Sequence, residues 1–118
     1  MKTYVVNAVS LNMLSANCNG FQIIDRNPII EQDVVYSWDG LDWAHWGFVT
    51  PAIGHEATAV VIAGRYGLRT LDLFERRSLV CEPGDRLIVF QYSGPRLEEG
   101  TTQLPAGASL VPLLVEVI

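Results

Sequence analysis

The stretch AIGHEATAVVIAGRYG, residues Ala52–Gly67, decides the fold because it carries the main helical pattern of the chain. The Thr50–Pro51 pair before it is a start signal, and Gly67 is a stop signal, so we predict a helix over Ile53–Tyr66. Gly64 would let another backbone approach closely, at a modest cost in helix propensity. The expected apolar stripe consists of Ile53, Ala57, Val60, Val61 and Gly64.

Segments rich in β-branched and aromatic residues surround this helix and predict strands. The predicted strands are Thr3–Val9, buried on both faces, then Gly20–Asp25, Val34–Ser37, a hairpin over Ser78–Tyr92 that turns at Pro83–Gly84, and Ser109–Ile118. Pro112 places the start of the last strand at an edge or bulge. Leu41–Trp46 is predicted as a short helix, and Gly94–Ala108 as a long functional loop. The expected fold is α/β: a mixed β-sheet with one main helix and short flanking helices, in a single domain over residues 1–118.

Composition limits the partners of the protein. The chain has 118 residues, 49% of them hydrophobic, and a formal net charge of −5. A duplex nucleic-acid binder needs a basic face, so we expect no such partner. No apolar stretch is long enough to span a bilayer, and two isolated cysteines favour free thiols in a reducing compartment. We therefore expect a soluble cytoplasmic protein without a membrane partner.

His55, in the first turn of the predicted helix, is the leading candidate for chemistry. Unpaired N–H groups at a helix start attract anions, and a histidine beside a bound phosphate can give a proton to a leaving oxygen. The alternative is a packing role. A metal site built from Asp42, His45 and His55 has a spacing that matches no known ligand motif, so no metal is expected.

Two further polar groups carry alternatives. Arg96, Glu98 and Glu99 form either a solvated turn or a phosphate clamp, in which Arg96 binds the phosphate and a glutamate orients Arg96 or His55. Asn7 is poorly suited to a strand interior, so either it acts through its side chain, as Ser10 and Asn12 nearby could, or it caps the following turn.

Four blocks together resemble the small ring nucleases of the type III anti-CRISPR family, which occur in archaeal viruses, bacteriophages and some cellular CRISPR loci. The blocks are VVNAVSLNML, AIGHEATA, GDRLIVFQY and RLEEG, in that order and spacing. They cover somewhat over half of the chain. The Ile-Gly-His-Glu and Arg-Leu-x-Glu-Gly blocks are specific as a pair.

This resemblance implies a dimeric α/β protein that binds cyclic tetra-adenylate across the dimer. It would cut the ring, without a metal or other cofactor, into linear di-adenylates that end in a 2′,3′-cyclic phosphate. The implied catalytic residues are His55, Arg96 and Glu99. The implied ligand-binding residues are Asn7, Ser10, Asn12, Gly54, Arg76 and Gln91.

The chain also departs from the family pattern. Glu98 stands where the family often has proline, and Glu75 where it often has asparagine. Residues 15–50, with Trp38, Trp43 and Trp46, match poorly. The function expected from the resemblance is a phosphodiesterase that switches off type III CRISPR signalling, in the host cytoplasm if the gene is viral. The alternative is a non-catalytic protein that sequesters the cyclic nucleotide.

Overall fold

A computed structural model describes all 118 residues as two β-sheets and one main helix. The larger sheet contains β1 (Thr3–Val6), β2 (Phe21–Asp25), β6 (Val49–Pro51), β7 (Arg86–Ser93) and β8 (Ser109–Val117). The smaller sheet contains β3 (Ile29–Ile30), β4 (Val34–Tyr36) and β5 (Asp42–His45). The helix is α1 (Glu56–Tyr66), and three single turns of 3₁₀ helix cover Leu11–Met13, Trp46–Phe48 and Thr70–Asp72.

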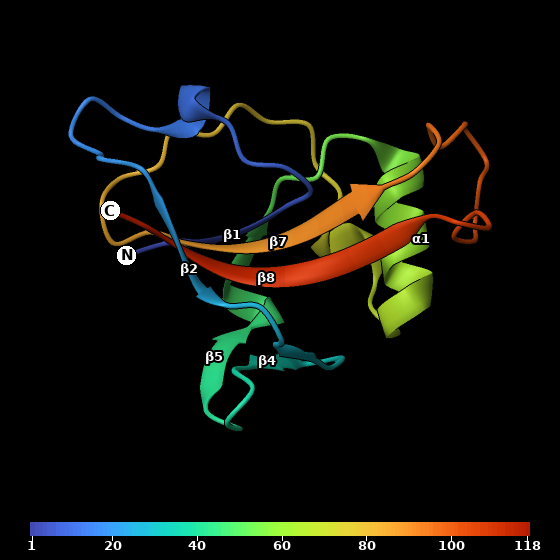
Figure 1. The fold of residues 1–118 in the computed structure, drawn as a ribbon, viewed down its shortest axis with the longest axis horizontal. Helices are drawn as coiled ribbons and strands as arrows, with labels where there is room; N and C mark the ends of the chain where they lie inside the picture. Colours follow the sequence, from blue (N-terminus) through green and yellow to red (C-terminus); the bar gives the residue numbers. More distant parts are fainter.

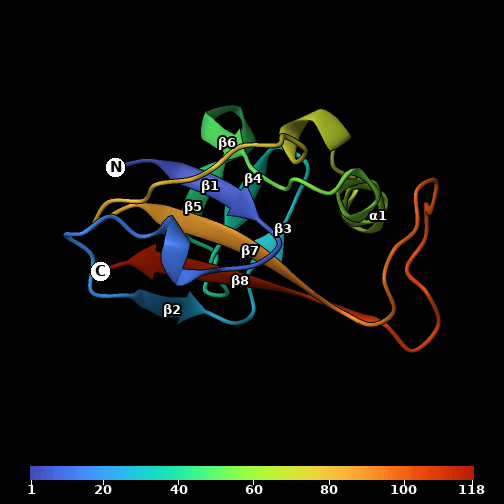
Figure 2. The same cartoon turned by 90° about the horizontal axis from the view of Figure 1, so that it is seen from above.

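The larger sheet is mixed, as the sequence predicts. Its strand order is β2-β8-β7-β1-β6, and Figure 2 shows these strands side by side. β1 runs parallel to both β6 and β7, whereas β8 runs antiparallel to β7 and β2. The carboxyl ends of β1, β6 and β7 therefore meet at one edge of the sheet.

Both faces of the larger sheet are covered. Val5, Ile88 and Phe90 pack on one face against α1 and the smaller sheet, whereas Tyr4 and Val6 pack on the other face. That second face is covered by the segment around Leu11–Met13 and by the chain before β7 (Figure 1). Burial of β1 on both sides confirms the prediction made from its apolar run, although the strand ends at Val6.

α1 begins three residues later than predicted. Ile53 is held in an extended bridge to Phe74, in which its N–H donates to the Leu73 carbonyl at 3.0 Å. The chain can therefore turn into a helix only after Gly54, and His55 becomes the N-cap. At the other end Gly67 adopts φ 68°, which confirms it as the stop.

Two predicted elements are wrong. Leu41–Trp46 is not a helix, because Asp42–His45 pairs with β4 and Trp46 then enters a 3₁₀ turn. Ser78–Cys81 is not a hairpin strand, because it forms a single bridge from Cys81 to Leu14. Pro112 lies within β8, opposite Phe90 of β7. β2 pairs with β8 only from Leu114 onward, so on the β2 side there is no strand that would need a hydrogen bond from residue 112.

Candidate active site

The predicted site residues follow the parallel strands. Asn7 comes directly after β1, the Ala52–His55 segment follows β6, and Gln91 lies near the end of β7. The Ala52 N–H donates to the Val5 carbonyl at 3.0 Å, which keeps the segment after β6 beside β1. In open α/β sheets, ligands bind outside the carboxyl ends of the strands, and this edge is such a place.

His55 is held by the helix that it starts. Its backbone is extended (φ −107°, ψ 112°), and its Nδ1 accepts from the Thr58 N–H at 3.4 Å. Nδ1 also lies 2.9 Å from Thr58 Oγ1. The ring is nonetheless exposed, so Nε2 remains free to reach a ligand.

The start of α1 also supplies unused donors. The N–H groups of Glu56 and Ala57 find no acceptor within the chain. Unpaired N–H groups at the positive end of a helix dipole favour a bound anion. The two residues lie next to His55, so an anion held there would lie beside the imidazole.

Arg76 approaches the same helix start from a different segment. The Glu75 N–H donates to the Ile53 carbonyl at 3.1 Å, which runs this segment alongside the residues before His55. The contact is close to Gly54, where a Cβ would lie 4.0 Å from both Cα and Cγ of Arg76. The guanidinium of Arg76 stacks over the Phe74 ring at 5.2 Å, which restricts its position.

The loop after β7 forms the opposite wall. Leu97 is 4% exposed and packs against Ala57 and Val61 of α1, so the loop is anchored to the helix (Figure 1). Further along, the Thr102 carbonyl oxygen would lie 3.7 Å from a Cβ on Gly64. The close approach predicted at Gly64 is therefore made by this loop.

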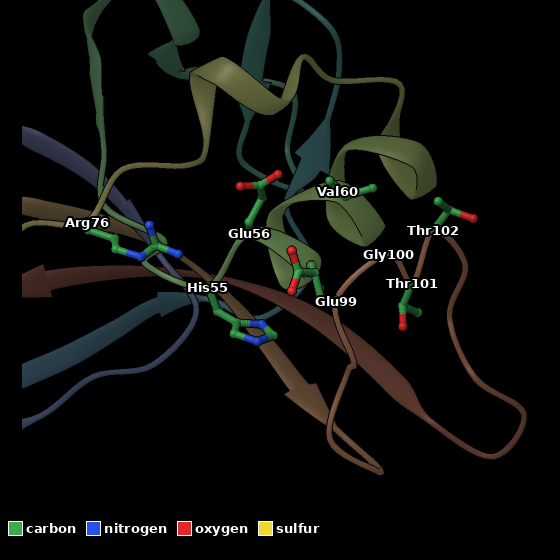
Figure 3. Close-up of a pocket in the computed structure, with 9 residues that line it drawn as sticks. His55, Glu56, Val60, Arg76, Glu99, Gly100, Thr101 and Thr102 are labelled. Carbon is green, nitrogen blue, oxygen red and sulfur yellow. The ribbon is translucent and has the colours of Figure 1, made fainter.

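These elements enclose a pocket of about 320 Å³. In Figure 3 the side chains of Arg76 and Glu99 lie on either side of His55, with Thr101 and Thr102 beyond Glu99. The lining residues are His55, Glu56, Ala57, Val60, Arg76, Glu99, Gly100, Thr101 and Thr102. The pocket contains the carboxylates of Glu56 and Glu99 and only one guanidinium, that of Arg76. Because the two carboxylates oppose a bound anion, anion binding depends on Arg76 together with the free N–H groups.

Several predicted site residues do not line this pocket. Arg96 is exposed and outside it, although it adjoins the buried Leu97. Ser10 caps the Leu11–Met13 turn, accepting from the Asn12 N–H at 3.3 Å. Asn7 and Asn12 also lie outside the pocket, and Gln91 alternates onto the face of the sheet opposite α1.

Three of the polar side chains that line the pocket were not predicted as site residues: Glu56, Thr101 and Thr102. Glu56 adjoins His55 in the sequence and could have been found from that adjacency alone. The two threonines carry no motif, because only folding of the loop onto α1 brings them to the pocket. None of the three tryptophans lines it: Trp46 stacks on Phe90 in the core, and Trp43 lies under the Arg86 guanidinium.

The remaining titratable groups do not assemble into a metal site. His45 Nε2 lies 3.4 Å from Asp42 Oδ2, and both side chains are exposed on β5. No set of three or more His, Cys, Asp or Glu side chains is grouped to hold an ion. No helix of the structure has the length and apolar character needed to cross a membrane.

Comparison with protein families matches residues 3–106 to the family described as STIV B116-like. The chain belongs to the STIV B116-like family. Among solved structures it is similar to B116 of Sulfolobus turreted icosahedral virus, at 22% sequence identity and a TM-score of 0.61, covering 99% of this chain and 98% of that one. The likeness to B116 shows the fold of this family along nearly the whole chain. Comparison with curated proteins gave no match.

Proposed function

We propose that this member of the family is a metal-independent phosphodiesterase that opens cyclic tetra-adenylate and so ends type III CRISPR signalling. One observation carries the proposal: His55, Arg76 and Glu99, from three segments far apart in the sequence, line one pocket with two free helix-start N–H groups. The ring-nuclease resemblance implies catalytic roles for His55 and Glu99 and a ligand-binding role for Arg76, whereas its catalytic arginine, Arg96, lies outside this pocket. Family membership by itself assigns no activity.

The reaction uses the neighbouring 2′-hydroxyl of the ring as the nucleophile. Its oxygen forms a new bond to phosphorus while its proton passes to water, and the bond to the 5′-oxygen breaks. The 5′-oxygen takes the proton from Nε2 of His55 in its imidazolium form, which leaves the neutral imidazole. The ring regains a proton from water before the next turnover. General acid catalysis of this kind is typically worth about 10²–10⁴-fold.

The negative charge that develops on the phosphorane would be stabilised by hydrogen-bond donors of residues that line the pocket. These are the Arg76 guanidinium and the N–H groups of Glu56 and Ala57. Such preorganised donors are often the largest single contribution to catalysis. Glu99 would position a neighbouring cation, and Arg96 joins the site if its loop shifts toward the bound ring.

A dimer follows from the shape of the ligand. A pocket of about 320 Å³ is at the small end of ligand sites and suits one nucleotide unit, not a four-membered ring. The ring has a two-fold axis, so a symmetric dimer would place one His55 at each of two opposite phosphates. Asn7, Ser10, Asn12 and Gln91, which lie outside the pocket of one chain, would then contact the rest of the ring.

The test is incubation of the purified protein with cyclic tri-, tetra- and hexa-adenylate, with and without excess EDTA, followed by chromatography. We expect linear di-adenylate with a 2′,3′-cyclic phosphate from the tetramer, undiminished by EDTA. Binding without product would favour the sequestering alternative. Loss of activity in EDTA with rescue by one divalent ion would exclude the 2′-hydroxyl mechanism as written, and a monomer by light scattering with ligand present would exclude the shared cleft.

A further inference from the structure

Thr58 is a buried polar residue that the proposed reaction does not use. It is 6% exposed and lies on the first turn of α1, below the pocket wall. Its hydroxyl and its backbone N–H both contact one atom, Nδ1 of His55, at 2.9 Å and 3.4 Å. It does not itself line the pocket.

The two contacts together determine which nitrogen carries the imidazole proton. A backbone N–H can only donate, so Nδ1 must accept from Thr58 and cannot itself be protonated in this arrangement. The Thr58 hydroxyl can then only donate to the same atom. In the neutral ring the remaining proton must therefore sit on Nε2, the nitrogen free to reach the ligand.

We propose that Thr58 is a positioning residue that holds His55 in the Nε2–H tautomer and in one rotamer. The inference deepens the proposed function, on which it rests: with Nδ1 held by Thr58, the proton of the neutral ring sits on Nε2. When Nδ1 takes up a proton beside a bound phosphate, the Thr58 hydroxyl can turn and accept from it, so the imidazolium that acts as the acid keeps the same rotamer. The inference explains why a β-branched polar residue is buried at the third position of α1, where a threonine loses helix propensity. It also gives the helix start two roles, anion binding through free N–H groups and orientation of the acid.

The first test is long-range ¹H–¹⁵N NMR of the two imidazoles in labelled protein without ligand. We expect His55 in the wild type to show an unprotonated Nδ1 and a protonated Nε2. Thr58→Val should shift His55 toward a mixture of tautomers, and Thr58→Ser should restore the wild-type pattern. His45, exposed on β5, is the internal reference and should not change; His45→Gln assigns its signals.

If Thr58→Val does not fold, Thr58→Ala removes the same hydroxyl without added bulk. A protonated Nδ1 in the wild type, or an unchanged tautomer in a folded variant without the hydroxyl, would overturn the proposal. Both tautomer measurements are made without substrate, so they test the role of Thr58 whether or not the protein cleaves a cyclic oligoadenylate.

The second test measures single-turnover cleavage of cyclic tetra-adenylate. Thr58→Val should lower the rate about 10-fold, the effect of one lost hydrogen bond, while the ring affinity stays unchanged. Thr58→Ser should recover the rate. Equal loss in both variants would mean a packing role and would overturn the proposal. Absence of cleavage in the wild type would instead count against the proposed function, leaving the tautomer result in place.

Discussion

The carbonyl oxygen of Thr102 lies where a Cβ on Gly64 would meet it at 3.7 Å, so the loop after β7 rests directly on α1. That distance is an ordinary van der Waals contact, and Gly64 lies in the last turn of α1. The glycine is therefore tolerated by the fold but is not required by it.

Gly64→Ala should stabilise the protein, because alanine gains helix propensity and its methyl group fits the space. We expect the free energy of unfolding to rise by about 0.5–1 kcal/mol, measured by urea denaturation. A loss of stability would mean that the loop cannot accommodate a methyl group and presses more tightly on α1 than 3.7 Å implies.

Gly94→Ala should do the opposite at the base of the same loop. Gly94 has φ 154°, and a Cβ there would lie 2.6 Å from the Cβ of Ala108. The loss should be about 1–3 kcal/mol. Gly100→Ala is the matched control: it has φ 87° but nothing within 4 Å, so it reports backbone strain alone and should cost less. Equal losses in the two variants would exclude the steric contact as the cause.

Cys81 should resist alkylation and should make stability depend on pH. Burial, with the charges of Asp85, Cys18 and Glu82, raises its pKa from 9.0 to about 11. The folded protein therefore holds this proton more tightly than the unfolded chain, so its contribution is complete below about pH 9 and is lost as the pH rises toward about 11. We expect iodoacetamide at about pH 8 to label Cys18 before Cys81.

Urea unfolding at about pH 8 and about pH 10.5 measures the second effect. The fall in stability between the two should be smaller in Cys81→Ala than in the wild type, since Tyr4 and Tyr66, whose pKa values are also raised, remain in both. An identical fall would show that Cys81 does not titrate in this window.

The sequence predicts the parts of the fold that depend on local pattern. The run Thr3–Val6, the stop at Gly67 and the strand Arg86–Ser93 all follow from residue type. Leu41–Trp46 was wrong because its strand is created by pairing, Val35 with Ala44, between segments that are too short for periodicity to separate strand from helix. In the smaller sheet, the prediction of a strand over Val34–Ser37 is confirmed by β4, whereas its two partner strands were missed for the same reason.

The site was predicted unevenly for a related reason. His55 could be found because a helix start is visible in the sequence, and Arg76 and Glu99 through the resemblance. Thr58 could not be predicted, because its role comes from the 2.9 Å contact of its hydroxyl with His55 Nδ1. Thr101 could not be predicted either, because it reaches the pocket only on a loop that Leu97 anchors to α1. Contacts that form only when distant segments fold together correspond to no regular residue spacing in the sequence, so they could not be predicted from it.

Arg76 should carry more of the ring affinity than any other arginine of the chain, because it alone lines the pocket. Arg76→Ala should weaken binding of cyclic tetra-adenylate about 10–100-fold, as expected for a charged hydrogen bond, and should reduce the salt dependence of binding. Arg65→Ala, an exposed arginine on α1 outside the pocket, should leave the affinity unchanged. Arg96→Ala tests the loop: weaker binding and slower cleavage would place Arg96 on the bound ring. Unchanged affinity in Arg76→Ala would contradict the assignment of this pocket as the phosphate site.

The most direct test of the account is single-turnover cleavage of cyclic tetra-adenylate by the wild type, His55→Ala and His45→Ala, with ring affinity and melting temperature measured on the same samples. His45 is the matched control, the other histidine of the chain and exposed on β5. We predict that His55→Ala loses about 10²–10⁴-fold in rate, keeps its ring affinity and remains folded, while His45→Ala behaves as the wild type. A His55→Ala protein that cleaves the ring at the wild-type rate would contradict the central claim.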